Sequence, residues 1–338
     1  MSALEIRRAD GVMSLQDMGR PGHLAQGLSR GGAMDRMALI EAAALLGAPE
    51  VLPGIEMAGA GGVFAVTVPM RIALTGAPMR ALRDDEPLAW NASHLLQPGE
   101  TLRIGGTQAG MFGYLVPAGG FAEAEWLDSQ AAHLSIGIGG LLENGQVLAL
   151  GADPDPARPG QIIEPEQRFG GGTVRAMDSA QTGLFEGDVI AAFYDEKFTR
   201  AQQGNRQGVR FDASRAFSSA HAAGLASDMI GPGDIQMTGE GVPFVLMAEC
   251  QTIGGYPRIG RVLPNDLPRV AQAAPGAEIR FLHVPIDEAD ALFQSDADLL
   301  KGARGRCRPL LRDPATIRDL LSYQLIGGVT AGDELDRA

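Results

Sequence analysis

The chain has 338 residues, of which 45% are hydrophobic and 20% charged, the balance of a globular protein long enough for two domains. Its net charge of −13 argues against a nucleic-acid or anionic-membrane surface, because both of these ligands are themselves negative. No apolar run approaches the ~18 residues that cross a bilayer, and the start, MSALEIRRADGVMS, lacks the apolar region of a secretory signal.

Most apolar segments are short and end at Gly, Pro or Asp, a pattern that predicts antiparallel barrels or sandwiches. They are VFAVTV (63–68), RIALTG (71–76), TLRIGG (101–106), MFGYLVPAGG (111–120), QVLALG (146–151), VPFVLM (242–247) and EIRFLHV (278–284). Helical patterns are fewer. Residues 35–47 begin with an aspartate suited to an N-cap and end at a glycine, and the stretches 287–300 and 315–325 predict two further helices.

Composition divides the chain into four parts. Residues 152–172 are rich in proline, acids and glycine, which predicts a linker or long surface connection. We therefore expect domains at 1–151 and 173–285, followed by a helical tail at 286–338. PGETLRI (98–104) parallels PGAEIRF (275–281), and VPMRIAL (68–74) resembles VPFVLM (242–247) in the same order, which indicates either a tandem duplication or chance.

Two polar clusters lie near the N-terminus. SLQDMGRPG (14–22) predicts a tight loop with a pair between Asp17 and Arg20, which either pins a surface turn or presents the arginine to an anion. SRGGAMDR (29–36) precedes the first helix, so Asp35 is expected to cap that helix, while the N–H groups of the Gly-Gly turn suit an anion. Both clusters thus have a structural and a ligand-binding interpretation.

Three further clusters lie in the second half. GNRQGVRF (204–211) opens a strand with alternating arginines, which in the simpler interpretation are solvated. GPGDIQM (231–237) is a turn into a strand whose Gln236 would point inward and bond to backbone groups. ECQTIGGYPRI (249–259) follows a predicted core strand and is either a hairpin corner or a loop lining a ligand site, where its paired glycines permit close backbone approach.

Residues that mark nucleophiles, metals or nucleotide loops are sparse. Cys250 has no adjacent histidine and is not expected to be a nucleophile, and the five histidines show no metal-ligand spacing, so no metal is expected. Cys250 and Cys307 lie far apart, which favours reduced thiols and a cytoplasmic protein. The only lysines, Lys197 and Lys301, fit neither a Walker loop nor a Met-Lys-Met biotin site, so ATP or biotin chemistry would involve a partner chain.

Taken in order, the five clusters resemble the biotin-dependent carboxyltransferase-like family, which includes allophanate hydrolase subunit 2, Kip-type antagonist proteins and the C subunit of 5-oxoprolinase. SLQDMGRPG and GGAMD resemble its Ser-x-Gln-Asp-x-Gly-Arg-Pro-Gly and Ser-Gly-Ala-Met-Asp motifs, and GNRQGVRF resembles its Ser-Asp-Arg-Met-Gly-Tyr-Arg-Leu strand. GPGDIQM is similar to Pro-Gly-x-Ile-Gln-Val, and ECQTIGGYPRIGRVLPNDL to Asp-x-Gln-Thr-x-Gly-Gly-Tyr-Pro-x-Ile with its following Asp-Leu. The resemblance runs from about Leu4 to about Val284.

The resemblance implies a mainly β fold of two tandem cyclophilin-like β-barrel domains with a few short helices. It further implies a subunit of an ATP-dependent lactam hydrolase that converts 5-oxoproline to glutamate together with a smaller B-type subunit (Kip-inhibitor-like) and a separate A-type hydrolase subunit. ATP would be shared with these partner subunits, and biotin would enter only through a partner. No nucleic-acid or membrane partner is implied.

The matched motifs also suggest site residues. We expect Arg20 and Arg206 to stabilise charge and Asp35 or Glu249 to act as acid or base. The predicted substrate-binding residues are Gln16, Asp17, Met34, Gln236, Gln251, Thr252, Gly254, Gly255, Tyr256 and Pro257.

Three positions depart from the family's motifs. LDSQAAH (127–133) contains no arginine where the family has Gly-Ser-Arg-Ser-Thr, AMDSAQTG (176–183) replaces Leu-Pro-Gly-Pro-Gln, and Glu249 replaces an aspartate. Two other functions therefore stay open. One is carboxyl transfer in a biotin-dependent urea or allophanate-type system, and the other is a non-catalytic protein that antagonises a kinase inhibitor.

Overall fold

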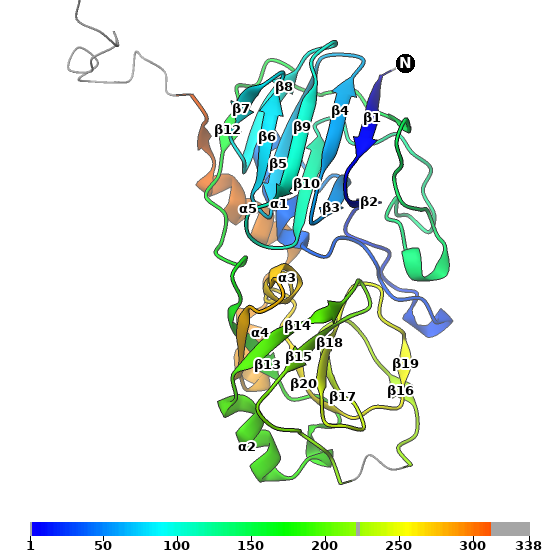
Figure 1. Cartoon of the computed structure of the whole chain (residues 1–338), viewed down its shortest axis with the longest axis vertical. Helices are drawn as coiled ribbons and strands as arrows, with labels where there is room; N and C mark the ends of the chain where they lie inside the picture. The colour runs from blue at the N-terminus through cyan, green and yellow to red at the C-terminus, as the bar shows by residue number, and fades with distance from the viewer. Residues whose placement is uncertain (1, 221–223, 312–338) are drawn as a thin grey trace, which may run out of the picture.

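The computed structural model describes residues 2–220 and 224–311. Its first half consists of two antiparallel sheets that pack face to face (Figure 1). One sheet contains, in order, β11 (Val147–Ala149), β1 (Ala3–Ala9), β4 (Gly62–Val66), β9 (Leu102–Thr107), β6 (Met79–Arg83) and β7 (Glu86–Leu88). The other contains β2 (Val12–Gln16), β3 (Gly54–Ala58), β10 (Phe112–Pro117), β5 (Met70–Gly76), β8 (Ala92–Leu96), β12 (Gln161–Ile162) and β22 (Arg308–Pro309).

The second half is a closed barrel, drawn below the sheets in Figure 1. Its seven strands are β13 (Gly172–Met177), β20 (Arg258–Val262), β17 (Asp234–Met237), β18 (Pro243–Leu246), β15 (Gly208–Asp212), β14 (Phe198–Gly204) and β21 (Glu278–His283). Only β13 and β21 pair in parallel among the barrel strands. A small ribbon of β16 (Asp228–Met229) and β19 (Ile253–Gly254) lies beside it. The predicted mainly β fold is confirmed.

Helices are few and short. They are α1 (Arg36–Leu46), α2 (Gly187–Asp195), α3 (Leu267–Gln272), α4 (Ile286–Leu292) and α5 (Asp296–Arg306), with single 3₁₀ turns η1 (Leu24–Gln26), η2 (Leu134–Ile136) and η3 (Thr182–Leu184). Phe193 of α2 closes one end of the barrel, stacking on Phe281 at 5.2 Å and meeting Phe198 and Phe217 edge-on or tilted. Within residues 2–220 and 224–311, no helix is long and apolar enough to cross a membrane.

The predicted helix at 35–47 is confirmed. The Asp35 carboxylate accepts from the N–H of Ala38, and Gly47 ends the helix in the left-handed region at φ 71°. Residues 37–46 are all buried, because α1 lies between β5 of the second sheet and α5 of the tail.

The single helix predicted at 287–300 is wrong, since the chain forms α4 and α5 with a break at residues 293–295. Ser295 caps α5 by accepting from the N–H of Asp298, and this local bond competes with a continuous helix. The predicted helix at 315–325 lies outside the described residues. α5 and β22 return the tail to the first half, where β22 pairs with β12.

The segment 152–172 is a packed connection. Within it, β12 pairs with β8, and Arg168 is buried beneath α1. We retain domains at 1–151 and 173–285 as a proposal, with 152–172 and the tail 286–338 bridging them. The proposed tandem duplication stays a prediction. The two matching stretches lie in β9 and β21, and these strands pair differently: both neighbours of β9 are antiparallel, whereas β21 pairs in parallel with β13.

Candidate functional site

A pocket of about 560 Å³ lies where the two halves meet. The first half contributes Ser14 of β2, Glu56 of β3 and Phe112 of β10 to its walls, and the second half contributes Arg206 and Glu249. We call it the charged pocket, because its polar lining is dominated by these ionised groups.

Arg206, in the turn between β14 and β15, lies between two carboxylates. Its Nη1 donates to Glu56 Oε1, its Nε donates to Glu249 Oε1, and its Nη2 donates to the Gly32 carbonyl at 2.6 Å. The three ionised side chains are only 12%, 4% and 2% exposed. One guanidinium therefore ties together segments of both halves through charge-assisted bonds.

Burial would raise the pKa of Glu249, but the charge and hydrogen bond of Arg206 outweigh burial and hold this pKa below its usual value. The Ser135 N–H adds a bond to Glu249 Oε2 at 2.9 Å. Burial likewise lowers the pKa of Arg206, yet the attraction of Glu56 and Glu249 raises it overall. Glu249 and Arg206 are thus both ionised at neutral pH.

Glu56 and Tyr114 are site residues that the sequence did not indicate. The Tyr114 hydroxyl donates to Glu56 Oε2 at 2.6 Å, the Met34 N–H donates to the same oxygen at 2.8 Å, and the Asp35 N–H donates to the Tyr114 oxygen at 2.8 Å. Burial raises the pKa of Tyr114 well above its ordinary value, so it remains a donor. Both residues sit within strands, where an inward glutamate or tyrosine leaves no local sequence signal.

His133 is a further residue to which the sequence assigned no role. Its Nε2 lies 2.8 Å from Ser29 Oγ, its Nδ1 lies 3.0 Å from Ser135 Oγ, and Glu249 Oε2 is 3.8 Å from Nδ1. Burial lowers the pKa of His133, with Arg20 and Arg206 acting in the same direction and Glu249 opposing them. The imidazole is therefore neutral at pH 7 and linked to the charged pocket through Ser135.

Although both residues are described, Asp17 and Arg20 form no ion pair, so the predicted pair is wrong. Arg20 is 1% exposed and donates to the carbonyls of Trp126 and Ala131 at 3.2 and 2.5 Å. Asp17 instead accepts from Ser129 Oγ at 2.8 Å. Backbone carbonyls of the 126–131 loop thus accept hydrogen bonds from Arg20, and the Ser129 hydroxyl donates one to Asp17. Because both charged groups have these partners, they do not need to pair with each other.

Of the other predicted residues near the N-terminus, Met34 lines the charged pocket, whereas Gln16 and Asp35 do not. Gln16 is fully buried and donates to Ser14 Oγ at 2.8 Å, while Met34 is buried and lines the pocket. Asp35 caps α1 as expected, and its Oδ2 also accepts from Arg168 Nε at 2.8 Å and Gln272 Nε2 at 2.7 Å. The Asp35 carboxylate therefore stabilises the fold through these hydrogen bonds.

A second pocket, of about 350 Å³, adjoins the charged pocket, and both are lined by Gly204, Asn205 and Gln207 of the β14–β15 turn. We call it the amide-lined pocket, because its walls carry several side-chain amides, Gln236 and Gln251 among them, beside Tyr256. Gln236 Nε2 is buried and has no hydrogen-bond partner among residues 2–220 and 224–311. Such a donor is costly to bury unless a ligand accepts from it.

Four further residues predicted to bind substrate are not among those that line this pocket, namely Thr252, Gly254, Gly255 and Pro257. The Thr252 carbonyl accepts from Ile230 N–H at 3.0 Å, and the Pro257 carbonyl accepts from Met237 N–H at 2.9 Å. Cys250 is buried, and burial raises the pKa of its thiol to about 12, so no thiolate forms at neutral pH. In the described part of the chain, no group of three or more His, Cys, Asp or Glu side chains could hold a metal ion.

Gly254 lies directly against Gln236. A Cβ at position 254 would be 2.7 Å from Gln236 Nε2 and 2.8 Å from Ile230 Cδ1, whereas the nearest atom to a Cβ at Gly255 is Ser227 Oγ at 3.6 Å. We expect Gly254→Ala to displace Gln236 and to lower the free energy of unfolding by about 1–3 kcal/mol. Gly255→Ala, the matched control, should stay within about 0.5 kcal/mol of wild type in urea denaturation. Equal effects of the two substitutions would contradict this prediction.

Comparison with known proteins gives a consistent result. A family described as the carboxyltransferase domain, subdomain A and B, matches residues 26–283. The chain is 31% identical over 283 residues to the C subunit of 5-oxoprolinase from Haemophilus influenzae, covering 82% of this chain and 90% of that protein. It is 26% identical over 301 residues to a putative urea carboxylase of Emericella nidulans, covering 83% of this chain but 24% of that protein. The crystal structure of TTHA0988 matches with a TM-score of 0.75 and 30% identity over 83% of this chain and just over half, 56%, of that one.

Proposed function

The chain belongs to the carboxyltransferase domain family, subdomains A and B, and from this premise we propose that it is the C subunit of a 5-oxoprolinase complex. Its 31% identity to the C subunit of a bacterial 5-oxoprolinase over most of both chains supports this assignment. That relative is named as one subunit among several, which implies an enzyme assembled from more than one chain. We propose that the partners are a smaller B-type subunit and a separate A-type hydrolase subunit.

The proposed reaction opens the lactam of 5-oxoproline. The water oxygen joins the carbonyl carbon, the C–N bond breaks, and the ring nitrogen takes up a proton, which yields glutamate. An amide carbonyl resists attack by water, and transfer of the γ-phosphoryl group of ATP to its oxygen, with release of ADP, would create a better electrophile. The phosphoryl group is then released as inorganic phosphate when the phosphorylated adduct is hydrolysed to glutamate. The complex must therefore orient the ring, accept a proton from water and stabilise negative charge on oxygen.

The observation that supports a role for this chain in orienting the ring, accepting the proton and stabilising the charge is that two suitable groups of side chains lie side by side. The unpartnered Gln236 donor lies in the amide-lined pocket, and the Arg206–Glu249 pair lies in the charged pocket across the shared β14–β15 turn. We propose that Gln236 and Gln251 orient the planar amide of the lactam. Glu249, which the low pKa keeps as a carboxylate, accepts the proton of water, and Arg206 stabilises the charge on oxygen.

The other predicted residues are assigned supporting roles in this proposal. Arg20 holds the 126–131 loop that leads to His133, and Asp35 supports α1 and the Arg168 network. Neither lines the charged pocket or the amide-lined pocket. We therefore propose that both are positioning residues.

ATP does not fit the charged pocket. Glu56 and Glu249 are balanced there by Arg200 and Arg206, so the lining carries no excess positive charge, whereas a triphosphate needs one. We propose that ATP is bound by the partner subunits. A cytoplasmic complex is in keeping with Cys250 and Cys307, both free thiols.

A second candidate is carboxyl transfer in a biotin-dependent system, favoured by the identity to a putative urea carboxylase. The amide-lined pocket would also suit the ureido ring of biotin, since lactam and ureido rings share a planar CO–NH edge. In this alternative, biotin is attached to a partner chain and Gln236 binds its ring.

Purification of the chain with its partner subunits, followed by measurement of 5-oxoproline-dependent ATP hydrolysis with and without avidin, tests the proposal. We expect turnover that avidin does not affect and that Glu249→Gln lowers at least about a hundredfold. Inhibition by avidin would support carboxyl transfer instead. Tight binding of the partners without turnover would support a non-catalytic protein that antagonises a kinase inhibitor.

A further inference from the structure

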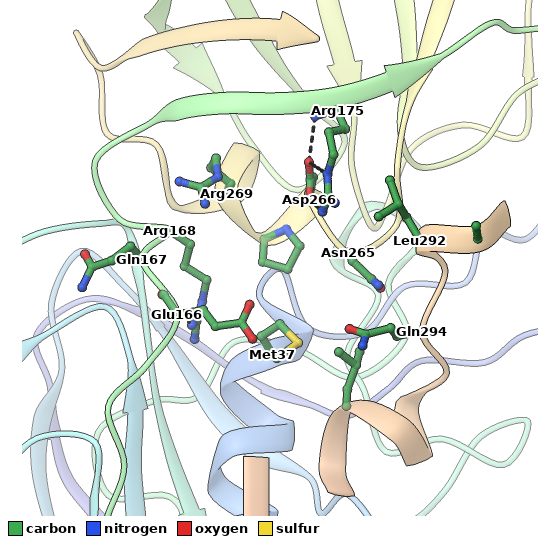
Figure 2. Close-up of a pocket in the computed structure, with 13 residues that line it drawn as sticks. Met37, Glu166, Gln167, Arg168, Arg175, Asn265, Asp266, Arg269, Leu292 and Gln294 are labelled. Carbon is green, nitrogen blue, oxygen red and sulfur yellow. Dashed lines mark hydrogen bonds and ion pairs between the residues drawn. The ribbon is translucent and has the colours of Figure 1, made fainter. Parts of the chain in front are cut away.

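A third pocket, of about 320 Å³, lies where α1, the connecting segment, α3 and the tail meet (Figure 2). Met37 of α1, Gln167 of the connection, Arg269 of α3 and Gln294 between α4 and α5 contribute to its walls. We call it the seam pocket. It contains none of the residues assigned to the proposed reaction, so it is a separate candidate site.

Two of the three arginines in its wall are already neutralised. Arg168 donates from Nε to Asp35 at 2.8 Å and from Nη2 to Glu41 at 2.6 Å. Arg175 donates from Nε and Nη2 to the two oxygens of Asp266 at 2.9 and 2.5 Å, the interaction dashed in Figure 2. These ion pairs account for both positive charges.

Arg269 differs from the other two. Its Nη1 donates to the Gly171 carbonyl at 2.9 Å, and it has no carboxylate partner among residues 2–220 and 224–311. Its Nε and Nη2 are left as donors beside the pocket, which a planar guanidinium presents as a fork suited to a carboxylate. The wall thus holds one guanidinium without an ion-pair partner among the described residues.

Neutral donors and an apolar floor complete the pocket. The side-chain amides of Gln167, Asn265 and Gln294 make no hydrogen bond within the described ranges 2–220 and 224–311, and Figure 2 shows Asn265 and Gln294 close together on the side away from Gln167. Met37 and Leu292 supply apolar surface. A volume of about 320 Å³ is at the small end of ligand pockets.

We propose that the seam pocket binds a small monocarboxylate that also carries an amide group. Arg269 receives the carboxylate, and the three amides bond to the neutral end of the ligand. A phosphate dianion fits less well, because Arg269 is one cation facing two negative charges, whereas it matches the single charge of a carboxylate. Since the walls come from both halves and the tail, bound ligand stabilises their packing.

N-acetylglycine is a suitable probe, because it is a small monocarboxylate with one amide, and N-acetylglycinamide is its uncharged control. We expect ligand-observed NMR titration of the full chain to show binding of N-acetylglycine that Arg269→Gln weakens about tenfold or more. The variant Gln294→Ala, at an exposed loop residue, should weaken binding several-fold with an unchanged melting temperature.

Arg280→Gln on β21, which lies outside every pocket described above, is the matched arginine control and should bind N-acetylglycine as wild type does. Unchanged binding in both Arg269→Gln and Gln294→Ala would overturn the proposal. So would equal binding of N-acetylglycinamide, or tighter binding of inorganic phosphate than of N-acetylglycine.

Discussion

Arg206→Ala is expected to abolish turnover of the reconstituted complex, with a loss of at least about a hundredfold, because it removes the cation that faces the reacting oxygen. The same substitution should lower the free energy of unfolding by about 3–5 kcal/mol. Glu56 and Glu249, only 4% and 2% exposed, would be left without the guanidinium that neutralises both. Guanidinium denaturation of the isolated chain and the coupled hydrolysis assay measure the two effects separately.

The pH dependence of this destabilisation follows from Glu249. Its pKa is lowered in the folded protein, so it contributes stability above its unfolded pKa of about 4.3, and this contribution is lost as the pH falls through the lower folded value. Without Arg206, the main group that lowers the pKa of Glu249 is lost, and burial, which raises it, is opposed only by the backbone N–H groups of Ser135 and Leu134. The stability difference between wild type and Arg206→Ala should therefore be largest at neutral pH and narrow below about pH 4.

Arg210→Ala is the matched control on the same hairpin. Arg210 is about one-third exposed and pairs with Asp212 at 2.9 Å at the surface, where an ion pair contributes only about 0–1 kcal/mol. We expect full turnover and little loss of stability. If Arg206→Ala behaves like Arg210→Ala, the central role of Arg206 in the charged pocket is wrong.

Arg168→Ala is expected to have a comparable effect on stability, about 3–5 kcal/mol, without a role in the chemistry. Arg168 donates to Asp35, which caps α1, and to Glu41 within α1, and both of these side chains are fully buried. Burial raises the pKa of Glu41, and Arg168 opposes that rise. In the variant, the carboxylate of Glu41 would therefore lose the cation that stabilises its negative charge. Urea denaturation at neutral pH measures the loss.

The double variant Arg168→Met with Glu41→Leu tests the cause. It removes one charge of each sign and leaves Asp35 with its bonds to Ala38 and Gln272. Replacing a buried ion pair by apolar groups of similar size is often close to neutral, so the double variant should regain much of the stability lost in Arg168→Ala. A double variant less stable than Arg168→Ala would show that packing, rather than unpaired charge, explains the loss.

These two arginines explain how the parts of the molecule are joined. Arg206 extends from the barrel to Glu56 in the first half, and Arg168 extends from the connecting segment to α1. The charged pocket lies between the halves, so its shape depends on such cross-connections. Substitutions at Arg168 are therefore expected to act on stability first and on turnover only through the position of α1.

Features that depend on neighbouring residues could be predicted from the amino-acid sequence. Short apolar runs ended by glycine and proline predicted a mainly β fold, and an aspartate cap with a terminal glycine placed α1 within a residue of its observed ends. The paired glycines of 249–259 were expected to permit close backbone approach, and Gly254 does lie against Gln236. Each of these signals acts over a few neighbouring residues.

Contacts between residues far apart in the sequence could not be predicted, because they depend on how the chain folds. Glu56 joins Arg206 across 150 residues, His133 reaches Glu249 across 116, and Asp17 turns to Ser129 instead of the nearby Arg20. A buried carboxylate or imidazole on a strand has no local pattern, because its partner is supplied by whichever segment the fold brings beside it. The seam pocket arises in the same way, since α1, the connection, α3 and the tail together form its walls and place Arg269 among the lining residues.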